Sequence, residues 1–279
     1  MAEELFELSM LGGSIERRYR KARPEVERMP WGSIDPRAYP EADVIEARYA
    51  WTRAAFQEHR TGAACTGVLG SLIEARAPID LIAVGARFPL DELVHVELCA
   101  RMATELGGGT EATHDPSALF VGASPDLPPL VRAVENTVRV FCVGEALSIP
   151  LLRSAWHHAS LPLPRAVLGR IVKDEAPHGA FGFIVLDWAL PNLTLADRAR
   201  IGKVADEGIG EIHKLWAELR ASPREGACGP VHPLGSLRVD DYLALAARAL
   251  RAHVIDPLLA RGIPVTKTET SFREGDARL

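Results

Sequence analysis

Two five-residue stretches of the chain carry side chains that can bind metal ions. Residues 91–95 and residues 174–178 both read D-E-x-x-H. Residues three apart on a helix lie on the same face, so the Glu and the His of each stretch can reach one point. A carboxylate beside an imidazole suits iron or manganese, which accept mixed oxygen and nitrogen ligands. The repeated motif therefore predicts a dimetal site built from Glu92, His95, Glu175 and His178.

Two further carboxylates are expected at this site. Glu58 precedes Glu92 by 34 residues, and Glu145 precedes Glu175 by 30. At about 1.5 Å of rise per residue, such spacings let antiparallel helices place their ligands at one level. Glu145 is the single acid in the apolar stretch 141–149, where a buried carboxylate needs a partner. Glu58 is less distinctive because polar residues flank it, and we expect it on the core side of its helix with His59 turned away.

These six residues resemble the ligands of the ferritin-like di-iron carboxylate superfamily, in which two helices each give a Glu and two others each give a Glu-x-x-His. The resemblance covers about residues 41–190 and implies an all-α fold, a ferritin-like four-helix bundle with a long crossover between two helix pairs. It implies that Glu92 and Glu175 bridge the ions, that His95 and His178 each give one nitrogen, and that Glu58 and Glu145 are terminal carboxylates. In oxygen-activating members the Asp before the Glu supports a ligand His, so Asp91 and Asp174 are each expected to hold the His of the other motif.

Two positions near the second motif bear on what the site could do. Arylamine N-oxygenases of this superfamily have an additional His where this chain has Ile171, so N-oxygenation is not implied. Pro177 removes a backbone N–H inside the motif and is expected to bend its helix. Such a bend could open a substrate cavity or only accommodate packing. The small residues that could line a cavity there, or only let helices approach closely, are Gly62, Ala63, Gly144, Ala146, Gly179 and Ala180. If they line a cavity, Ala180→Phe or Gly144→Leu would block turnover and spare metal binding.

Helices are expected throughout, because Ala, Leu, Arg and Glu dominate and apolar residues recur at spacings of three and four. Proline and glycine positions predict helices over residues 41–76, 79–106 with a kink at Pro89, 130–159, 164–190, 195–221 and 239–261. The chain is expected to form an irregular lead-in (1–40), the dimetal bundle (41–191), and C-terminal helices packed on the bundle with a disordered polar tail (192–279).

Composition excludes several classes of protein. The net charge of −5 argues against nucleic-acid binding, and the basic run at residues 17–21 is followed by acids, as in a solvated segment. The four Cys form no CxxC pair, which excludes the usual zinc and thioredoxin spacings. Cys65, Cys99, Cys142 and Trp51 lie at helical spacing from the ligands and are expected in the core, rather than as a sulfur ligand or a redox relay. The acidic N-terminus and the absence of a long apolar run predict a cytoplasmic protein with no membrane span.

The predicted function is that of an O2-dependent, non-haem di-iron oxygenase or oxidase acting on a small or carrier-bound organic substrate. Manganese or a mixed iron–manganese pair remains open because the ligand sets overlap. No flavin, nicotinamide or iron–sulfur motif is present, so an external electron donor is expected. Two alternatives stay open: a ferritin-like protein that oxidises and stores iron, and a dimanganese catalase-like enzyme. A monomer or homodimer would favour the enzyme, and a large closed shell would favour the store.

Overall fold

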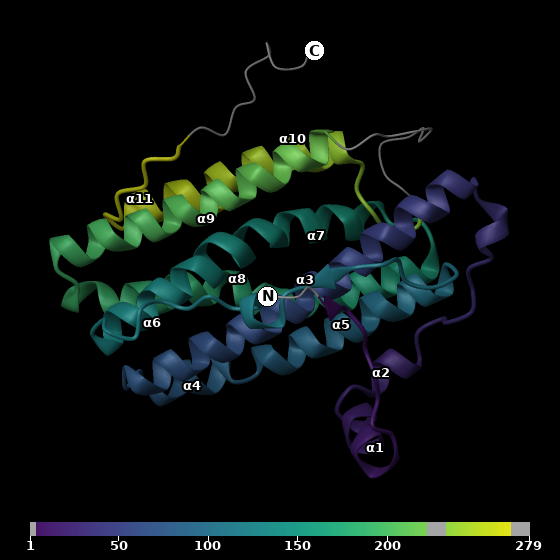
Figure 1. Cartoon of the computed structure of the whole chain (residues 1–279), viewed down its shortest axis with the longest axis horizontal. Helices are drawn as coiled ribbons and strands as arrows, with labels where there is room; N and C mark the ends of the chain where they lie inside the picture. The colour runs from purple at the N-terminus through teal and green to yellow at the C-terminus, as the bar shows by residue number, and fades with distance from the viewer. Residues whose placement is uncertain (1–3, 222–232, 269–279) are drawn as a thin grey trace.

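Helices make up most of the computed structural model, which describes residues 4–221 and 233–268 (Figure 1). The prediction of an all-α chain is confirmed. Within those ranges the only strands are β1 (Glu4–Leu5) and β2 (Thr113–His114), which pair antiparallel. They tie the start of the chain to the connection that follows α5 (Phe88–Glu105).

The helices that carry the D-E-x-x-H motifs and the two further acids pack in two antiparallel pairs. α3 (Glu41–Glu74) packs on α5, and α7 (Ala146–His158) packs on α8 (Pro162–Ala189). Contacts of α5 with α8 and of α3 with α6 (Pro129–Thr137) join the pairs. A long connection over residues 106–128, which includes the short helix η2 (Pro116–Ala118), crosses from one pair to the other.

The predicted second helix is two helices rather than one kinked helix. α4 (Ile79–Gly85) ends before residues 86–87, and α5 begins at Phe88 with Pro89 in its first turn. A proline inside a helix removes a hydrogen bond and clashes with the carbonyl four residues earlier, whereas the first turn tolerates it. The chain therefore breaks ahead of Pro89 instead of bending at it.

The third ligand helix contains a π-helical segment that the sequence did not predict. It runs from α6 through the π-helix η3 (Val138–Glu145) into α7. Glu145 is the last residue of the π-helix, and the Ser148 hydroxyl donates to its carbonyl at 3.0 Å. Pro150 follows inside α7 and removes one backbone donor. A π-helical turn changes the angular position of the residues that follow it, and such turns are frequent at functional sites.

The lead-in is more ordered than expected. It contains α1 (Gly13–Ala22), α2 (Pro24–Glu27) and the short η1 (Pro36–Ala38). Arg23, at the junction of α1 and α2, is 1% exposed and pairs with Glu27 at 2.6 Å and Glu97 at 2.7 Å. A buried guanidinium needs such partners. The basic run therefore ends just before Arg23, whose ion pair with Glu97 attaches the lead-in to α5. α1 itself has no buried residue.

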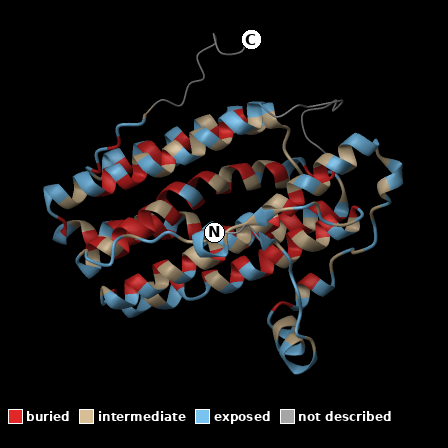
Figure 2. Ribbon diagram, in the orientation of Figure 1, coloured by how far each residue is buried: buried red, intermediate tan, exposed pale blue. Residues whose placement is uncertain are grey.

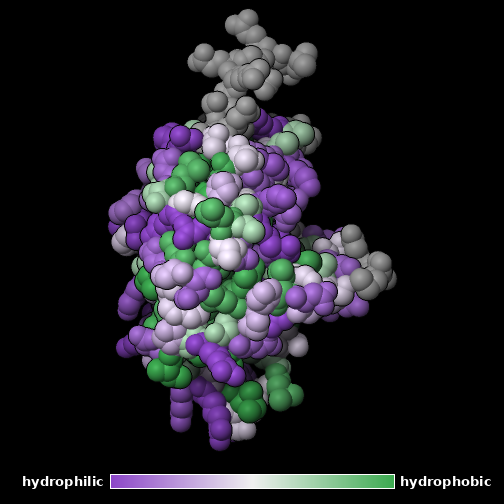
Figure 3. Space-filling view, turned by 90° about the vertical axis from the view of Figure 1, so that its left-hand side faces the viewer, coloured by the Kyte–Doolittle hydropathy of each residue, from purple (hydrophilic) through white to green (hydrophobic). Residues whose placement is uncertain are grey.

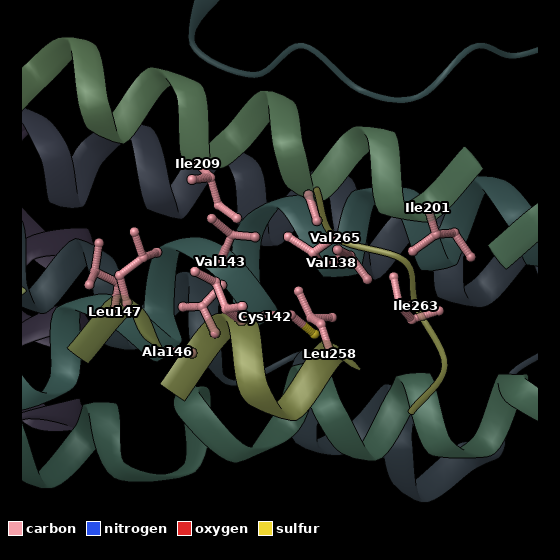
Figure 4. Close-up of a cluster of buried hydrophobic side chains, with 14 of the residues drawn as sticks. Val138, Cys142, Val143, Ala146, Leu147, Ile201, Ile209, Leu258, Ile263 and Val265 are labelled. Atoms are coloured by element: carbon pink, nitrogen blue, oxygen red, sulfur yellow. The ribbon is translucent and has the colours of Figure 1, made fainter. Parts of the chain in front are cut away.

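The C-terminal helices cover the α7 and α8 side of the ligand helices (Figures 1 and 2). Figure 4 shows side chains of α9 (Leu195–Ala221), α11 (Asp256–Ala260) and the segment after it meeting those of η3 and α7. The group includes Val143, Ile209, Leu258 and Ile263, each at most 2% exposed. The remaining C-terminal elements are η4 (Leu190–Asn192), α10 (Val239–Ala249) and the π-helix η5 (Leu250–Ile255).

Part of the predicted polar tail is anchored. The backbone N–H groups of Thr266 and Lys267 donate to Asp206 on α9, at 2.9 and 2.8 Å. The rest of the tail, from residue 269, and residues 222–232, between the predicted helices 195–221 and 239–261, lie outside the described residues.

The surface mixes polar and apolar side chains. On the face shown in Figure 3, apolar side chains gather toward the middle and hydrophilic ones surround them. Among the described residues, no helix combines the length and the apolar character that crossing a bilayer requires.

Candidate metal centre

The structure brings all six predicted ligand residues together. Glu58 comes from α3 and Glu145 from the end of η3. Each D-E-x-x-H motif gives one Glu and one His, from α5 and from α8. They form two overlapping groups: Glu58, Glu92, His95 and Glu175, and Glu92, Glu145, Glu175 and His178. Within each group, one ligand atom per residue lies within 4.8 Å of all the others. The two groups share Glu92 and Glu175, the residues expected to bridge.

The two imidazoles face the shared carboxylates. His95 Nδ1 lies 3.1 Å from Glu175 Oε1 and 3.6 Å from Glu92 Oε2. His178 Nδ1 lies 3.0 Å from Glu92 Oε1 and 3.0 Å from Glu175 Oε2. Glu58 completes the first group, with its Oε2 3.5 Å from His95 Nδ1. Each shared carboxylate therefore has one oxygen toward each histidine.

Several of these atoms are buried without an aligned hydrogen-bond partner among residues 4–221 and 233–268. They are both carboxylate oxygens of Glu92, Oε2 of Glu175, Nδ1 of His95 and both ring nitrogens of His178. Buried polar atoms in folded proteins are nearly always hydrogen-bonded, and an exception calls for an explanation such as an ion. Oxygen and nitrogen atoms that converge without hydrogen bonds fit a cation, so this donor set could hold metal.

Burial and neighbouring carboxylates shift the pKa values of four residues at the site. Burial and the neighbouring carboxylates raise the pKa of Glu58 to about 8, and the same causes raise the pKa of Glu145 well above its usual value. Burial alone would lower the pKa of both histidines, but the surrounding carboxylates outweigh it. The pKa of His95 lies well above its usual value, and that of His178 rises to about 12. The buried carboxylates thus favour positive charge among them.

The aspartates of the motifs lie behind the histidines of the opposite motifs, as the resemblance implies. His95 Nε2 is 3.2 Å from Asp174 Oδ2, within hydrogen-bonding distance. His178 Nε2 is 3.8 Å from Asp91 Oδ2, too far for a direct hydrogen bond. Asp174 also pairs with Arg170, whose Nε donates to Glu25 on α2 at 2.9 Å. Asp91 pairs with Arg87 at 3.3 Å.

Sequence reasoning missed these arginines, although a signal was present. Each lies four residues before its aspartate, so both motifs read R-x-x-x-D-E-x-x-H. Opposite charges four apart on a helix are neighbours, which predicts both pairs. The link from Arg170 to Glu25 has no such signal because 145 residues separate the two in sequence.

Two phenylalanines lie beside His178, and a third packs on them. The ring centroid of Phe88 lies 4.1 Å from that of the His178 imidazole, and the ring centroid of Phe141 lies 6.4 Å from it. Phe181 packs on the rings of Phe88 and Phe141. All three are at most 2% exposed. They come from α5, η3 and α8, so the apolar wall is built by the same helices as the ligands.

An apolar cavity of about 270 Å³ reaches the site from the other side, where Glu58 is one of its lining residues. The rest of the lining is carbon-rich and includes Trp51, Ala54, Cys99 and Ile171. The Glu58 side chain is 14% exposed, against 0% for Glu92 and both histidines. Glu58 is therefore the carboxylate through which this cavity meets the site.

The small residues that could line a cavity, or only let helices approach closely, do not line the cavity at Glu58. Ala146, Gly179 and Ala180 line a separate hollow of about 380 Å³ between α7, α8 and α11, and none of the six ligand residues lines it. Gly62 lets two helices approach, since a Cβ there would lie 3.3 Å from the Cβ of Glu92. α8 continues through Pro177, which is exposed and lines neither cavity. Of the two alternatives left open for these residues, the structure gives no support to a cavity that reaches the ligands, because none of them lines the cavity at Glu58.

The residues expected in the core are buried. Trp51, Cys65, Cys99 and Cys142 are each at most 4% exposed. None of the three cysteines belongs to either group of candidate ligands. His59 is partly exposed and stacks near Phe6, turned away from the site.

Comparison of the sequence with models of known protein families finds no match, and comparison with curated proteins finds no match either.

Proposed function

We propose that this chain is a ferritin-like dimetal protein that uses two iron ions and O2 to oxidise a small or carrier-bound organic substrate. The observation that carries this proposal is the pair of four-residue ligand groups sharing Glu92 and Glu175. Shared carboxylates suit two ions held about 3.5–4 Å apart, as in other two-metal sites. Four carboxylates with two imidazoles favour iron or manganese over zinc or calcium.

The side chains divide the work of such a site. Glu92 and Glu175 would bridge the ions, His95 and His178 would each bind one ion, and Glu58 and Glu145 would bind at the ends. A pair of ferrous ions supplies electrons for the reduction of O2. The phenylalanines around His178 exclude water, and Asp174 holds the His95 ring with its Nδ1 toward the site. Insertion of one oxygen atom, with the other released as water, takes two electrons and two protons from outside, so the proposal includes an external reductant.

The cavity at Glu58 favours an enzyme that oxidises an organic substrate over the two alternatives, an iron store and a catalase. An iron store moves only ions, and a catalase acts on hydrogen peroxide, so neither needs a carbon-lined cavity of about 270 Å³ at a ligand. Substrate sites in proteins are mostly apolar concavities with a few polar groups, as this cavity is.

The test is metal content followed by O2 chemistry. The protein purified after growth with iron should contain about two ions per chain, and the anaerobic ferrous form should consume O2 with a transient visible absorption. His178→Ala should lose at least one ion, whereas His157→Ala, on the exposed end of α7, should keep both. Absence of bound iron and manganese would overturn the proposal. Many irons per chain inside a large closed shell would instead indicate a store, and manganese with peroxide dismutation would indicate a catalase.

A further inference from the structure

The cavity at Glu58 has a wall that the ligand helices do not supply. Its lining includes Gly235, Ser236, Leu237 and Tyr242, from the segment that leads into α10 and from α10 itself. The other sides come from α3, α5, α7 and α8. The C-terminal part of the chain therefore supplies one wall of the cavity that lies beside Glu58.

This wall segment is fixed in place on α3. The indole N–H of Trp51 donates to the carbonyl of Leu234 at 2.9 Å, and Leu234 is fully buried. Gly235 has φ +98°, and a Cβ there would lie 2.8 Å from the Trp51 ring and 3.0 Å from Pro164. Only glycine fits such a position. The contact sets how far the segment stands from Glu58, since Trp51 lies seven residues earlier on α3, about 10 Å along the helix axis.

The chemistry of the lining restricts the ligand. Glu58 is the single charged residue among the lining residues, and it belongs to the candidate metal centre. Ser236 also lines the cavity, and its hydroxyl is buried without a hydrogen-bond partner in the described part of the chain. A buried hydroxyl without a partner is costly, and a ligand oxygen can satisfy it. No lining residue offers a positive charge to an anionic ligand.

We propose that this cavity is the substrate pocket, that it takes a neutral, mainly apolar molecule carrying one hydroxyl or carbonyl, and that Ser236 binds that oxygen. The apolar end of the molecule then extends along α3 from Trp51 toward Glu58. The inference rests on the proposed function for the reaction itself, but binding to the pocket does not require metal.

The test uses straight-chain alcohols as probes of the metal-free full-length protein, with binding measured by calorimetry. Affinity should rise about fourfold per methylene from butanol through hexanol to octanol, as expected for burial of each CH2 group. Octanoate should bind at least about tenfold more weakly than octanol, because its charge would be buried beside Ser236, where no lining residue offers a positive partner. Equal or tighter binding of octanoate would overturn the proposed substrate class.

Variants locate the probe. Ala54→Leu fills the pocket from α3 and should weaken octanol binding by about tenfold or more, whereas Ala180→Leu, in the separate hollow, should leave it unchanged. Ser236→Ala should weaken hexanol binding by about fivefold, the worth of one hydrogen bond, and leave hexane binding unchanged. An equal loss for hexanol and hexane would remove Ser236 from recognition. Probe binding that ignores Ala54→Leu would place the ligand elsewhere. If the protein binds alcohols but no metal, the proposed function is contradicted and the proposed pocket stands. If it binds metal but no alcohol, the proposed pocket is contradicted and the proposed function stands.

Discussion

The two halves of the candidate metal centre are built from the same motif and differ in almost everything around it. We call Glu58, His95 and Asp174 the His95 side, and Glu145, His178 and Asp91 the His178 side. On the His95 side the aspartate lies within hydrogen-bonding distance, at 3.2 Å, and an apolar cavity reaches the terminal carboxylate. On the His178 side the aspartate is 3.8 Å away, two phenylalanines lie beside the imidazole, and a third packs on them.

The difference shows how repeated ligands can acquire separate tasks. The arginine behind Asp174 is 13% exposed and continues to Glu25, whereas the arginine behind Asp91 is 70% exposed. In the proposed enzyme, substrate meets the His95 side, and the His178 side is shielded from water. The sequence motif sets which atoms can bind metal, and the packing around each copy sets what else can reach them.

The largest expected effect comes from a residue that belongs to both sides. Glu92→Ala should lose both ions, because each group of ligands uses its carboxylate. Glu58→Ala and Glu145→Ala should each lose about one ion. Metal analysis of the purified variants measures this, with His157→Ala as the control. Retention of both ions in Glu92→Ala would break the picture of two sides joined by shared carboxylates.

The aspartates provide a direct comparison of the two sides. Replacing a carboxylate that orients a metal-bound histidine typically weakens metal binding by about 10–100-fold. Asp174→Asn should fall at the upper end of that range and Asp91→Asn at the lower end, because only the first lies within hydrogen-bonding distance of its histidine. Titration with Mn²⁺ gives both affinities. A larger loss for Asp91→Asn would reverse the assignment.

The pH dependence of metal binding should also differ between wild type and a His95-side variant. Ion binding requires the Glu58 carboxylate, whose pKa is raised to about 8, so it displaces a proton at neutral pH. Below that pKa, competition with this proton alone makes the affinity for Mn²⁺ rise about tenfold per pH unit. Above that pKa, this proton no longer changes the affinity. Glu58→Gln should release one proton fewer on Mn²⁺ binding, as measured by calorimetry in buffers of different ionisation enthalpy. An unchanged proton release would show that Glu58 is not a ligand.

The smallest effect is expected from the arginines. Arg87→Gln removes an exposed partner of Asp91 and should change Mn²⁺ affinity by about twofold or less, as exposed ion pairs contribute little. Arg170→Gln should cost more, because Arg170 is mostly buried and also pairs with Glu25. Glu25→Gln isolates that second contact and should fall between the two. Similar affinities for all three variants would limit the difference between the sides to the aspartates.

The sequence was sufficient for the parts of the site that depend on helical spacing. Glu92 with His95 and Glu175 with His178 lie three apart on single helices, so their convergence follows from helix geometry. Glu58 and Glu145 could be chosen because equal levels on antiparallel helices follow from rise per residue. Proline positions marked most helix ends, although Pro89 lies in the first turn of a new helix and does not kink a continuous one.

The parts that escaped prediction depend on contacts between distant residues. The cavity could not be located because its wall at Gly235 and Ser236 is held by Trp51, which is 183 residues before Leu234 in the chain. The order of the lead-in depends on Arg23 finding Glu97 and on Glu25 finding Arg170. The π-helix that ends at Glu145 leaves no periodic signal, since it alters the winding within a continuous helical stretch.

The contact between Trp51 and Leu234 also has a consequence for the order in which the protein is made. The four ligand-bearing helices are complete once synthesis passes Ala189, but the pocket wall begins only at Leu234. At about 5–20 residues per second, the ribosome needs roughly 2–9 seconds to add the intervening residues. During that interval the ligand residues have all been synthesised and the wall has not. The cavity at Glu58 thus gains its last wall only after all six candidate ligand residues have been made.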